Sequence, residues 1–252
     1  MDFHQNDLSA EKIRGYIELR KKEQRLFPDE WVMHLPKLPR ESIHHEEWKI
    51  REKSMQRLLN YLPANKNLEI LDLGCGNGWL ANVLAKNTNY NVLGIEINDE
   101  EFAQAKSLFT SNNCKFLQSD IFNENFELHQ FDCIILNASI QYFPDPVQLI
   151  DRLLNLMSEG GSIHIIDTPI YKSKDVSAAK KRSREYFEKM GVPGMQYHYF
   201  HHSTEMLRPY DYDYLYFPGT KLRRFFQIFS GPDSPFPWIR ISGRKSAKQN
   251  DA

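Results

Sequence analysis

The sequence predicts an α/β protein built on one doubly wound, mostly parallel sheet with helices on both faces. From about residue 67, short apolar strands alternate with helical patterns, which is typical of parallel sheets covered on both sides. At the first strand-to-helix junction, three glycines at alternate positions predict a tight turn that can approach a ligand closely. The helix that follows would point its free N–H groups at that ligand.

Each element of this core has its own pattern. Short apolar runs predict strands at 68–73, 91–97, 114–118, 131–136 and 162–167. Apolar residues at helical spacing predict helices between them, at 78–87, 99–111 and 146–157. The whole chain is expected to form one domain, with an N-terminal helical flank at 1–62, a ligand-binding core at 63–170 and a substrate-side part at 171–252.

The two flanking parts are predicted in less regular terms. The N-terminal flank is expected to hold helices at 8–26 and 44–61, with a short helical or extended segment at 31–35. In the C-terminal part we expect a basic helix at about 174–190, then a short helix capped by Ser203. Two final strands are expected at 211–217 and 237–243, with a possible further helix inside the intervening 218–235.

Composition limits the class of protein. The 41% hydrophobic and 26% charged residues are typical of a soluble globular chain. No apolar run is long enough to span a bilayer and the first residues lack a signal-peptide pattern, so we expect no membrane insertion and a cytoplasmic location. Cys75, Cys114 and Cys133 are expected to be buried free thiols in a reducing compartment.

Charge is unevenly distributed along the chain. Residues 67–170 carry 4 Lys or Arg and 14 Asp or Glu, whereas residues 171–252 carry 15 and 8. This asymmetry would suit a cationic cofactor on one side and an anionic substrate on the other. A solvated basic helix is the simpler interpretation, and it is the one we favour.

Ligands bind open parallel sheets at the carboxyl ends of the strands, so polar residues there are candidates for a site. The first strand ends in Asp72 and the glycine loop 74–78. The second ends in Glu96, whose carboxylate can accept hydrogen bonds from both hydroxyls of a ribose. After the third strand, Asp120 could accept from an adenine amino group, and Asn137 ends the fourth.

The glycine spacing separates two classes of cofactor. A dinucleotide fingerprint has Gly-x-Gly-x-x-Gly, but here the third glycine comes one position early. Asp72 also stands two residues before the first glycine, where its carboxylate would repel a pyrophosphate. The same carboxylate would suit a cofactor that carries an ammonium group and a sulfonium.

The segment Asp72-Leu-Gly-Cys-Gly-Asn-Gly resembles the first motif of the class I S-adenosylmethionine-dependent methyltransferases. Glu96, Asp120-Ile121 and residues 137–142 fall where that family has its later motifs, so the resemblance covers about residues 44–168. It implies a Rossmann-like sheet of seven strands, the last antiparallel. It also implies S-adenosyl-L-methionine as cofactor and S-adenosyl-L-homocysteine as product.

The resemblance also implies roles for particular residues. The glycine loop would hold the methionyl part, with Asp72 and the Asn137 backbone carbonyl near its ammonium. Glu96 would bind the ribose, and Asp120 with the Ile121 backbone would bind the adenine. The residues assigned in this way to the cofactor are Asp72, Gly74, Cys75, Gly76, Gly78, Glu96, Ile97, Asp120, Ile121 and Asn137. Trp48 and Arg51 precede the first strand, where the family often closes over its cofactor.

The acceptor side is less defined, and no catalytic residue is assigned. Candidates for substrate contact are Gln141, Tyr142, Tyr199 and His201, and candidates for a catalytic role are Tyr142, His198 and His201. The histidines, with His202, also invite a metal interpretation, but no cysteine is nearby and their spacing fits one helical face poorly, so we expect no metal. A general base acting on a substrate hydroxyl is one alternative, and an aromatic lid or packing segment is the one we favour.

These observations predict methyl transfer to a small-molecule acceptor, with oxygen preferred over nitrogen, by in-line attack on the sulfonium methyl. RNA or protein methylation is an alternative. Nucleic acid is disfavoured because Asn137-Ala-Ser-Ile differs from the Asn-Pro-Pro-aromatic motif of enzymes that methylate base amino groups. A non-catalytic, cofactor-binding regulatory or scaffold protein is the other alternative. The sequence does not indicate an oligomeric state.

Overall fold

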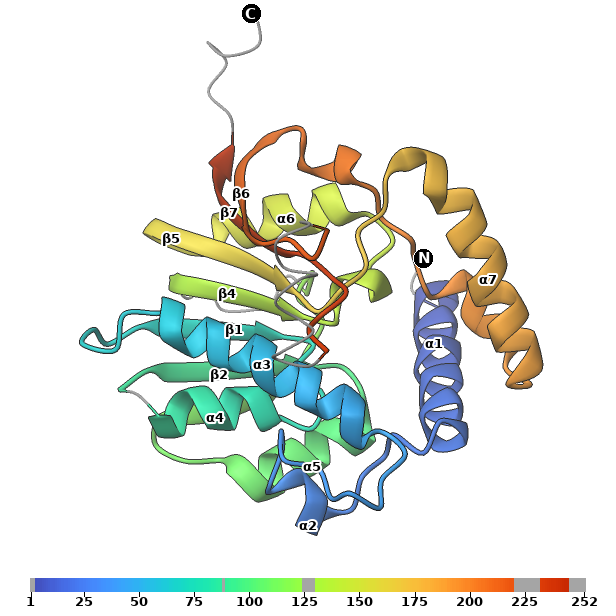
Figure 1. Cartoon of the computed structure of the whole chain (residues 1–252), viewed down its shortest axis with the longest axis horizontal. Coiled ribbons are helices and arrows are strands. Elements are labelled where there is room, and N and C mark those ends of the chain that lie inside the picture. The colour runs from blue at the N-terminus through green and yellow to red at the C-terminus, as the bar shows by residue number, and fades with distance from the viewer. Residues whose placement is uncertain (1–2, 88, 124–129, 220–231, 245–252) are drawn as a thin grey trace, which may run out of the picture.

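The computed structural model describes residues 3–87, 89–123, 130–219 and 232–244. Its centre is a seven-stranded sheet of order β3-β2-β1-β4-β5-β7-β6 (Figure 1). The strands are β1 Glu69–Leu73, β2 Asn91–Glu96, β3 Cys114–Gln118, β4 Phe131–Asn137, β5 Met157–Ile166, β6 Tyr210–Tyr216 and β7 Trp238–Arg244. The first five pair in parallel and β7 runs antiparallel to both its neighbours, which confirms the predicted fold class.

The helices follow the predicted order. They are α1 Phe3–Lys22, α2 Asp29–Val32, α3 His45–Tyr61, α4 Trp79–Asn87, α5 Asp99–Phe109, α6 Pro146–Asn155 and α7 Val176–Lys189. Four 3-10 turns complete the fold, η1 Ile140–Tyr142, η2 Ser173–Asp175, η3 Pro193–Tyr197 and η4 Thr204–Leu207. Ser203 caps η4 as expected, because its side chain accepts from the Glu205 amide.

Two hydrophobic layers hold the helices against the sheet. Alternate residues of a strand point to opposite faces, so Ile70 and Ile135 pack under α3 and α4. Their neighbours Leu71 and Ile134 pack against α6 on the other face. All four side chains are fully buried, which fixes the strand register and therefore the positions of the strand ends.

Some boundaries differ from the predictions. The helix predicted over 8–26 begins earlier, at Phe3, and it also ends earlier, because Gln24 adopts a left-handed conformation (φ 56°) just after it. β5 begins at Met157 although the prediction began at 162, because the Gly160–Gly161 segment forms an irregularity inside the strand pairing with β4. The further helix predicted within 218–235 falls mostly on 220–231, outside the described residues.

At the carboxyl edge of the sheet, α1 and α7 lie side by side, on the right in Figure 1. They share a small apolar cluster with η3 that includes Leu19, Phe187 and Met195. Polar bonds add to it: the Tyr186 hydroxyl donates to Glu23 (2.5 Å) and Lys22 donates to the Gly191 carbonyl (3.1 Å). None of the described helices is both long and apolar enough to cross a membrane.

Candidate active site

The loop between β1 and α4 requires glycine at two positions for steric reasons. Gly74 has φ 72°, and a Cβ there would lie 2.7 Å from the Cβ of Ser139. Gly78 has φ 77°, and a Cβ there would lie 2.7 Å from the Phe116 ring. These contacts pack the loop against Ser139, which follows β4, and against Phe116 of β3, and they keep its backbone close to any ligand above it.

Asp72, the penultimate residue of β1, is a buried carboxylate with only 1% of its surface exposed. Burial and the nearby charge of Glu96 raise the pKa of Asp72 to about 7. Its Oδ2 has no hydrogen-bond partner among the described residues, and the same holds for Oδ1 of Asn137 at the end of β4. Both residues line one cavity, so two buried acceptors are available there to a ligand that carries N–H donors.

Glu96 ends β2 beside this loop. One carboxylate oxygen accepts from the Gly76 amide (2.9 Å), and the other accepts from the amides of Ile97 (2.8 Å) and Asn98 (2.9 Å). These bonds fix the carboxylate between the glycine loop and the start of α5. A carboxylate oxygen can accept more than one bond, so the group can still receive ligand hydroxyls.

Two neighbouring cavities meet at the glycine loop. The larger, about 320 Å³, runs along the ends of β2, β3 and β4. Its lining includes the predicted residues Gly74, Gly76, Glu96, Ile97, Asp120, Ile121 and Tyr142. Asp120 is exposed at its edge and its Oδ1 accepts from the Phe122 amide (2.9 Å). The walls are largely apolar, which suits a planar ring with few polar edges.

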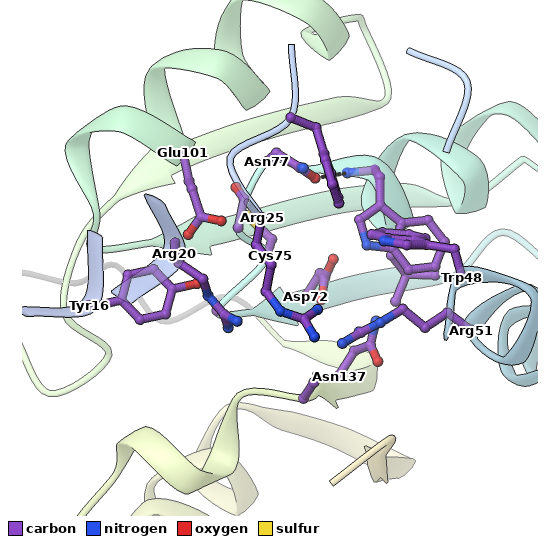
Figure 2. A pocket seen from close by; sticks show the side chains of 16 residues that line it. Tyr16, Arg20, Arg25, Trp48, Arg51, Asp72, Cys75, Asn77, Glu101 and Asn137 are labelled. Atoms are coloured by element: carbon purple, nitrogen blue, oxygen red, sulfur yellow. Dashed lines mark hydrogen bonds between the residues drawn. The ribbon is translucent and has the colours of Figure 1, made fainter. Parts of the chain in front are cut away.

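The smaller cavity, about 100 Å³, lies between the glycine loop and the N-terminal helices (Figure 2). Asp72, Cys75 and Asn137 line it from the sheet side. From the opposite side, the side chains of Arg20, Arg25 and Arg51 point into the same space (Figure 2). Gly78 lines neither cavity, and its role in the structure is the close packing of α5 and β3 on the loop.

Two of these arginines are held by one carboxylate. Arg25 donates to both oxygens of Glu47 (2.9 and 2.6 Å), and Arg51 donates twice to Oε1 of Glu47 (both 3.1 Å). Although burial opposes ionisation, these bonds and charges lower the pKa of Glu47 to about 2. Arg51 also lies over the ring of Trp48 (5.4 Å). The two guanidinium groups are therefore oriented before any ligand arrives.

The third arginine belongs to a different group of residues. Arg20 donates to the Tyr142 hydroxyl (3.2 Å) and to Glu23 (3.1 Å), and its guanidinium lies over the Tyr16 ring (4.8 Å). Tyr16 lines both cavities, so this group stands where they meet. Burial raises the pKa of both tyrosines, which keeps the phenols neutral.

Glu101, in the first turn of α5, adds a further acid to the smaller cavity. Burial and then the charge of Glu96 raise its pKa to about 7, although Arg20 and a hydrogen bond from Tyr16 act in the opposite direction. Its Oε1 lies 3.4 Å from where a Cβ on Gly76 would stand. The carboxylate therefore faces the glycine loop.

Several residues predicted to contact the methyl acceptor bond or pack with other parts of the protein. Gln141 is buried and donates to the Ala138 carbonyl (2.6 Å). Tyr199 packs against the Tyr142 ring (5.8 Å), and His201 bonds with Ser183 (2.8 Å). With His198, these residues line neither of the two cavities in the described part of the chain. No three His, Cys, Asp or Glu of the described residues gather as metal ligands.

Sequence reasoning missed Tyr16, Arg20, Arg25 and Glu101. The three from the N-terminal segment are far in sequence from the loop that they face, so nothing local indicated the contact. Tyr16 and Arg20 are four residues apart on one helical face, which was the only available signal. Glu101 was not identified as a site residue, because acidic residues in the first turn of a helix usually only complement the helix dipole.

Comparison with known proteins is consistent with this geometry. A family described as "Methyltransferase domain" matches residues 64–210, more than half of the chain. A malonyl-[acyl-carrier protein] O-methyltransferase from Acetivibrio thermocellus is 28% identical over 149 residues, 55% of this chain and 52% of the relative. A trans-aconitate 2-methyltransferase from Escherichia coli O7:K1 is 29% identical over 116 residues, 46% of this chain and 45% of the relative. The chain thus spans about half the length of the curated relatives it matches.

Solved structures agree in fold. The plantazolicin methyltransferase BpumL, in complex with a pentazolic desmethylPZN analog and SAH, superimposes with TM-score 0.53 and 17% identity over 97% of this chain and 100% of that chain. The YcgJ protein from Bacillus subtilis gives TM-score 0.57 and 14% identity over 77% of this chain and 100% of that chain. The chain belongs to the methyltransferase-domain family and has the Rossmann-like fold of the class I S-adenosylmethionine-dependent methyltransferases.

Proposed function

We propose that the protein transfers a methyl group from S-adenosyl-L-methionine to an oxygen atom of a small molecule. The observation that carries the proposal is the position of α1. Tyr16 of this helix lines both cavities at the point where they meet, so the helix covers the reaction space. A helix over the site in this way favours a small acceptor and limits the access of water to the reaction.

The chemistry of the residues fits the cofactor. Adenine and ribose would occupy the larger cavity, with the hydroxyls at Glu96 and the amino group at Asp120. The ammonium would lie in the smaller cavity at Asp72, whose Oδ2 lacks a partner in the described chain. The cofactor carboxylate would face Arg25 and Arg51, which Glu47 already orients. Bound in this way, the cofactor supplies an electrophilic methyl group, and the protein positions it.

The relatives support a small or carrier-bound acceptor. The names malonyl-[acyl-carrier protein] O-methyltransferase and trans-aconitate 2-methyltransferase each contain such an acceptor, and the first specifies oxygen. RNA remains the competing substrate, because α7 carries exposed basic residues such as Lys181 and Arg184. A nucleotide would have to enter beneath α1, and for that reason we favour the small molecule.

The test is release of S-adenosylhomocysteine by the purified protein, measured by mass spectrometry, with phenols, alcohols, carboxylates, amines and RNA as acceptors. We expect turnover with at least one small oxygen acceptor, and its loss in Gly76→Arg, whose side chain would fill the smaller cavity. Glu96→Ala serves as a second variant if Gly76→Arg does not fold. Turnover with RNA alone, or none above the variant background, would overturn the proposal.

A further inference from the structure

We propose that the acceptor oxygen belongs to a carboxylate that Arg20 binds directly. This inference rests on the proposed function and narrows its substrate class. The guanidinium of Arg20 points into the smaller cavity from α1 (Figure 2). Arg20 bonds to Tyr142 in η1, the turn after β4, and lies over Tyr16, so it stands on the α1 side of the site.

Arg20 differs from the other two arginines in having no contact with Glu47. Arg25 and Arg51 share Glu47. Arg20 pairs with Glu23, three residues along the chain, and the carboxylate of Glu101 also acts on its charge. Glu23 also pairs with Arg25 (3.3 Å) and accepts from the Tyr186 hydroxyl. Glu23 therefore serves several donors, and the pKa of Glu101 is raised to about 7, so that carboxyl is only partly ionised at neutral pH. The charge of Arg20 is for both reasons only partly compensated.

The bonding capacity of Arg20 leaves room for a ligand. Its bonds to Tyr142 and Glu23 use two of the five N–H groups of a guanidinium. A guanidinium prefers planar two-oxygen anions, because parallel N–H groups can bond to both oxygens. A carboxylate matches this geometry and charge, whereas a neutral hydroxyl or a protonated amine does not.

The surroundings also favour an acceptor that is already ionised. A hydroxyl must lose a proton around the transfer, yet no histidine of the described chain lines either cavity. Tyr16 and Tyr142 are phenols with raised pKa and do not ionise at neutral pH. Asp72 lines the cavity beside the loop that would hold the cofactor. Glu101 faces the same loop and is already engaged by a hydrogen bond from Tyr16 and by the charge of Arg20.

Methyl transfer to a carboxylate involves one bond formed and one bond broken. One carboxylate oxygen forms a bond to the methyl carbon while the bond between that carbon and sulfur breaks. The electron pair of the broken bond stays on sulfur, which becomes a neutral thioether. The acceptor becomes a neutral methyl ester and no proton moves, so the reaction needs no base.

The test uses methyl-labelled S-adenosylmethionine with two sets of probes. One set contains acetate, succinate, glutarate, citrate and benzoate beside their amides, phenol and simple amines. The other is a small-molecule extract of cells of the source organism. Labelled products are then treated with mild alkali, because methyl esters release volatile methanol whereas methyl ethers and methylamines do not.

We expect alkali-labile label, with carboxylates accepted and the matching amides refused. Label that resists alkali would overturn the carboxylate proposal and leave the methyltransferase function standing. No labelled product from either set would overturn both, so the two failures are distinguishable.

Variants then test Arg20 itself. We expect Arg20→Met to raise the KM for the accepted carboxylate about 10- to 100-fold, and Arg20→Lys to raise it less, because lysine keeps the charge and loses the planar pair of donors. The Kd for S-adenosylhomocysteine should change little. Arg14→Met is the matched control, because Arg14 is exposed on the same helix and lines a separate groove. An unchanged KM in Arg20→Met, or an equal effect in Arg14→Met, would overturn the assignment.

Discussion

Arg20 donates a hydrogen bond to the Tyr142 hydroxyl over 3.2 Å, although 122 residues separate the two in sequence. This bond joins α1 to the turn that follows β4. It connects the covering helix to the strand end where methyl transfer is proposed to occur. The contact also shows the Tyr142 oxygen accepting a bond from a cation, an arrangement that suits positioning better than proton abstraction.

Tyr142→Phe tests that interpretation. Because the variant removes only the hydroxyl, we expect kcat to fall by less than about tenfold and its pH dependence to stay unchanged. A general base normally contributes about 10²- to 10⁴-fold. A loss of more than about a hundredfold, with one limb of the pH profile missing, would instead identify Tyr142 as the base.

Glu47→Gln tests whether the orientation of Arg25 and Arg51 matters for the cofactor. Glutamine keeps the shape but loses the charge that holds both guanidinium groups, so we expect the Kd for S-adenosylhomocysteine to rise roughly 5- to 20-fold. Isothermal titration measures it. Glu46→Gln is the matched control, because Glu46 pairs with Lys49 on the exposed side of the same helix. Equal values for the two variants would exclude a cofactor role for the pair.

The pH dependence of cofactor binding follows from Asp72 and Glu101. Burial raises both pKa values to about 7, so both carboxyls are partly protonated at neutral pH without ligand. A cationic ligand binds the ionised forms, and a proton must leave first when the pH is below the pKa. We expect the Kd for S-adenosylmethionine to rise as the pH falls below about 7, by up to about tenfold per pH unit for each group.

Titrations at pH 6, 7 and 8 in buffers of different ionisation enthalpy measure this effect and the protons released. Glu101→Gln should reduce the slope and leave the part due to Asp72. A Kd that is constant across this range would show that neither carboxyl titrates in the free site.

Gly78→Ala tests the packing of the glycine loop. The added methyl would stand 2.7 Å from Phe116 and 2.8 Å from Ala105, at a φ of 77°. We expect the free energy of unfolding to fall by about 2–5 kcal/mol, from backbone strain and overpacking together. Gly160→Ala has the same φ of 77° with nothing within 4 Å, so it should lose only about 1–2 kcal/mol.

Urea unfolding gives both values, and their difference isolates the steric overlap. If the two variants lose equal stability, the loop tolerates a side chain at Gly78, and close packing is not the reason for glycine there.

The centre of the sheet was predictable because β1, β2 and β4 are short apolar runs, each followed by a helix. The polar residues at the strand ends followed from topology alone: Asp72, Glu96 and Asn137 lie at the carboxyl ends of strands, and these ends meet at one edge of a parallel sheet. The start of β5 at Met157 was not predictable, because two glycines in a row normally indicate a turn.

The cationic side of the site could not be predicted in the same way. Arg20 and Arg25 reach the glycine loop through packing of α1 and the segment after it, which no local pattern specifies. His201 attracted attention as a titratable residue in an aromatic stretch, but it bonds with Ser183 away from both cavities. Its proposed catalytic role stays a prediction.

The central claim is that the site at Asp72 and Glu96 binds S-adenosylmethionine, and isothermal titration of the purified protein at pH 8 tests it most directly. We predict saturable binding of S-adenosylmethionine and S-adenosylhomocysteine, no binding of NADH, and a Kd at least about tenfold weaker in Glu96→Ala, which loses the ribose acceptor. Binding of NADH without binding of the methyl donor, or an unchanged Kd in Glu96→Ala, would contradict the account.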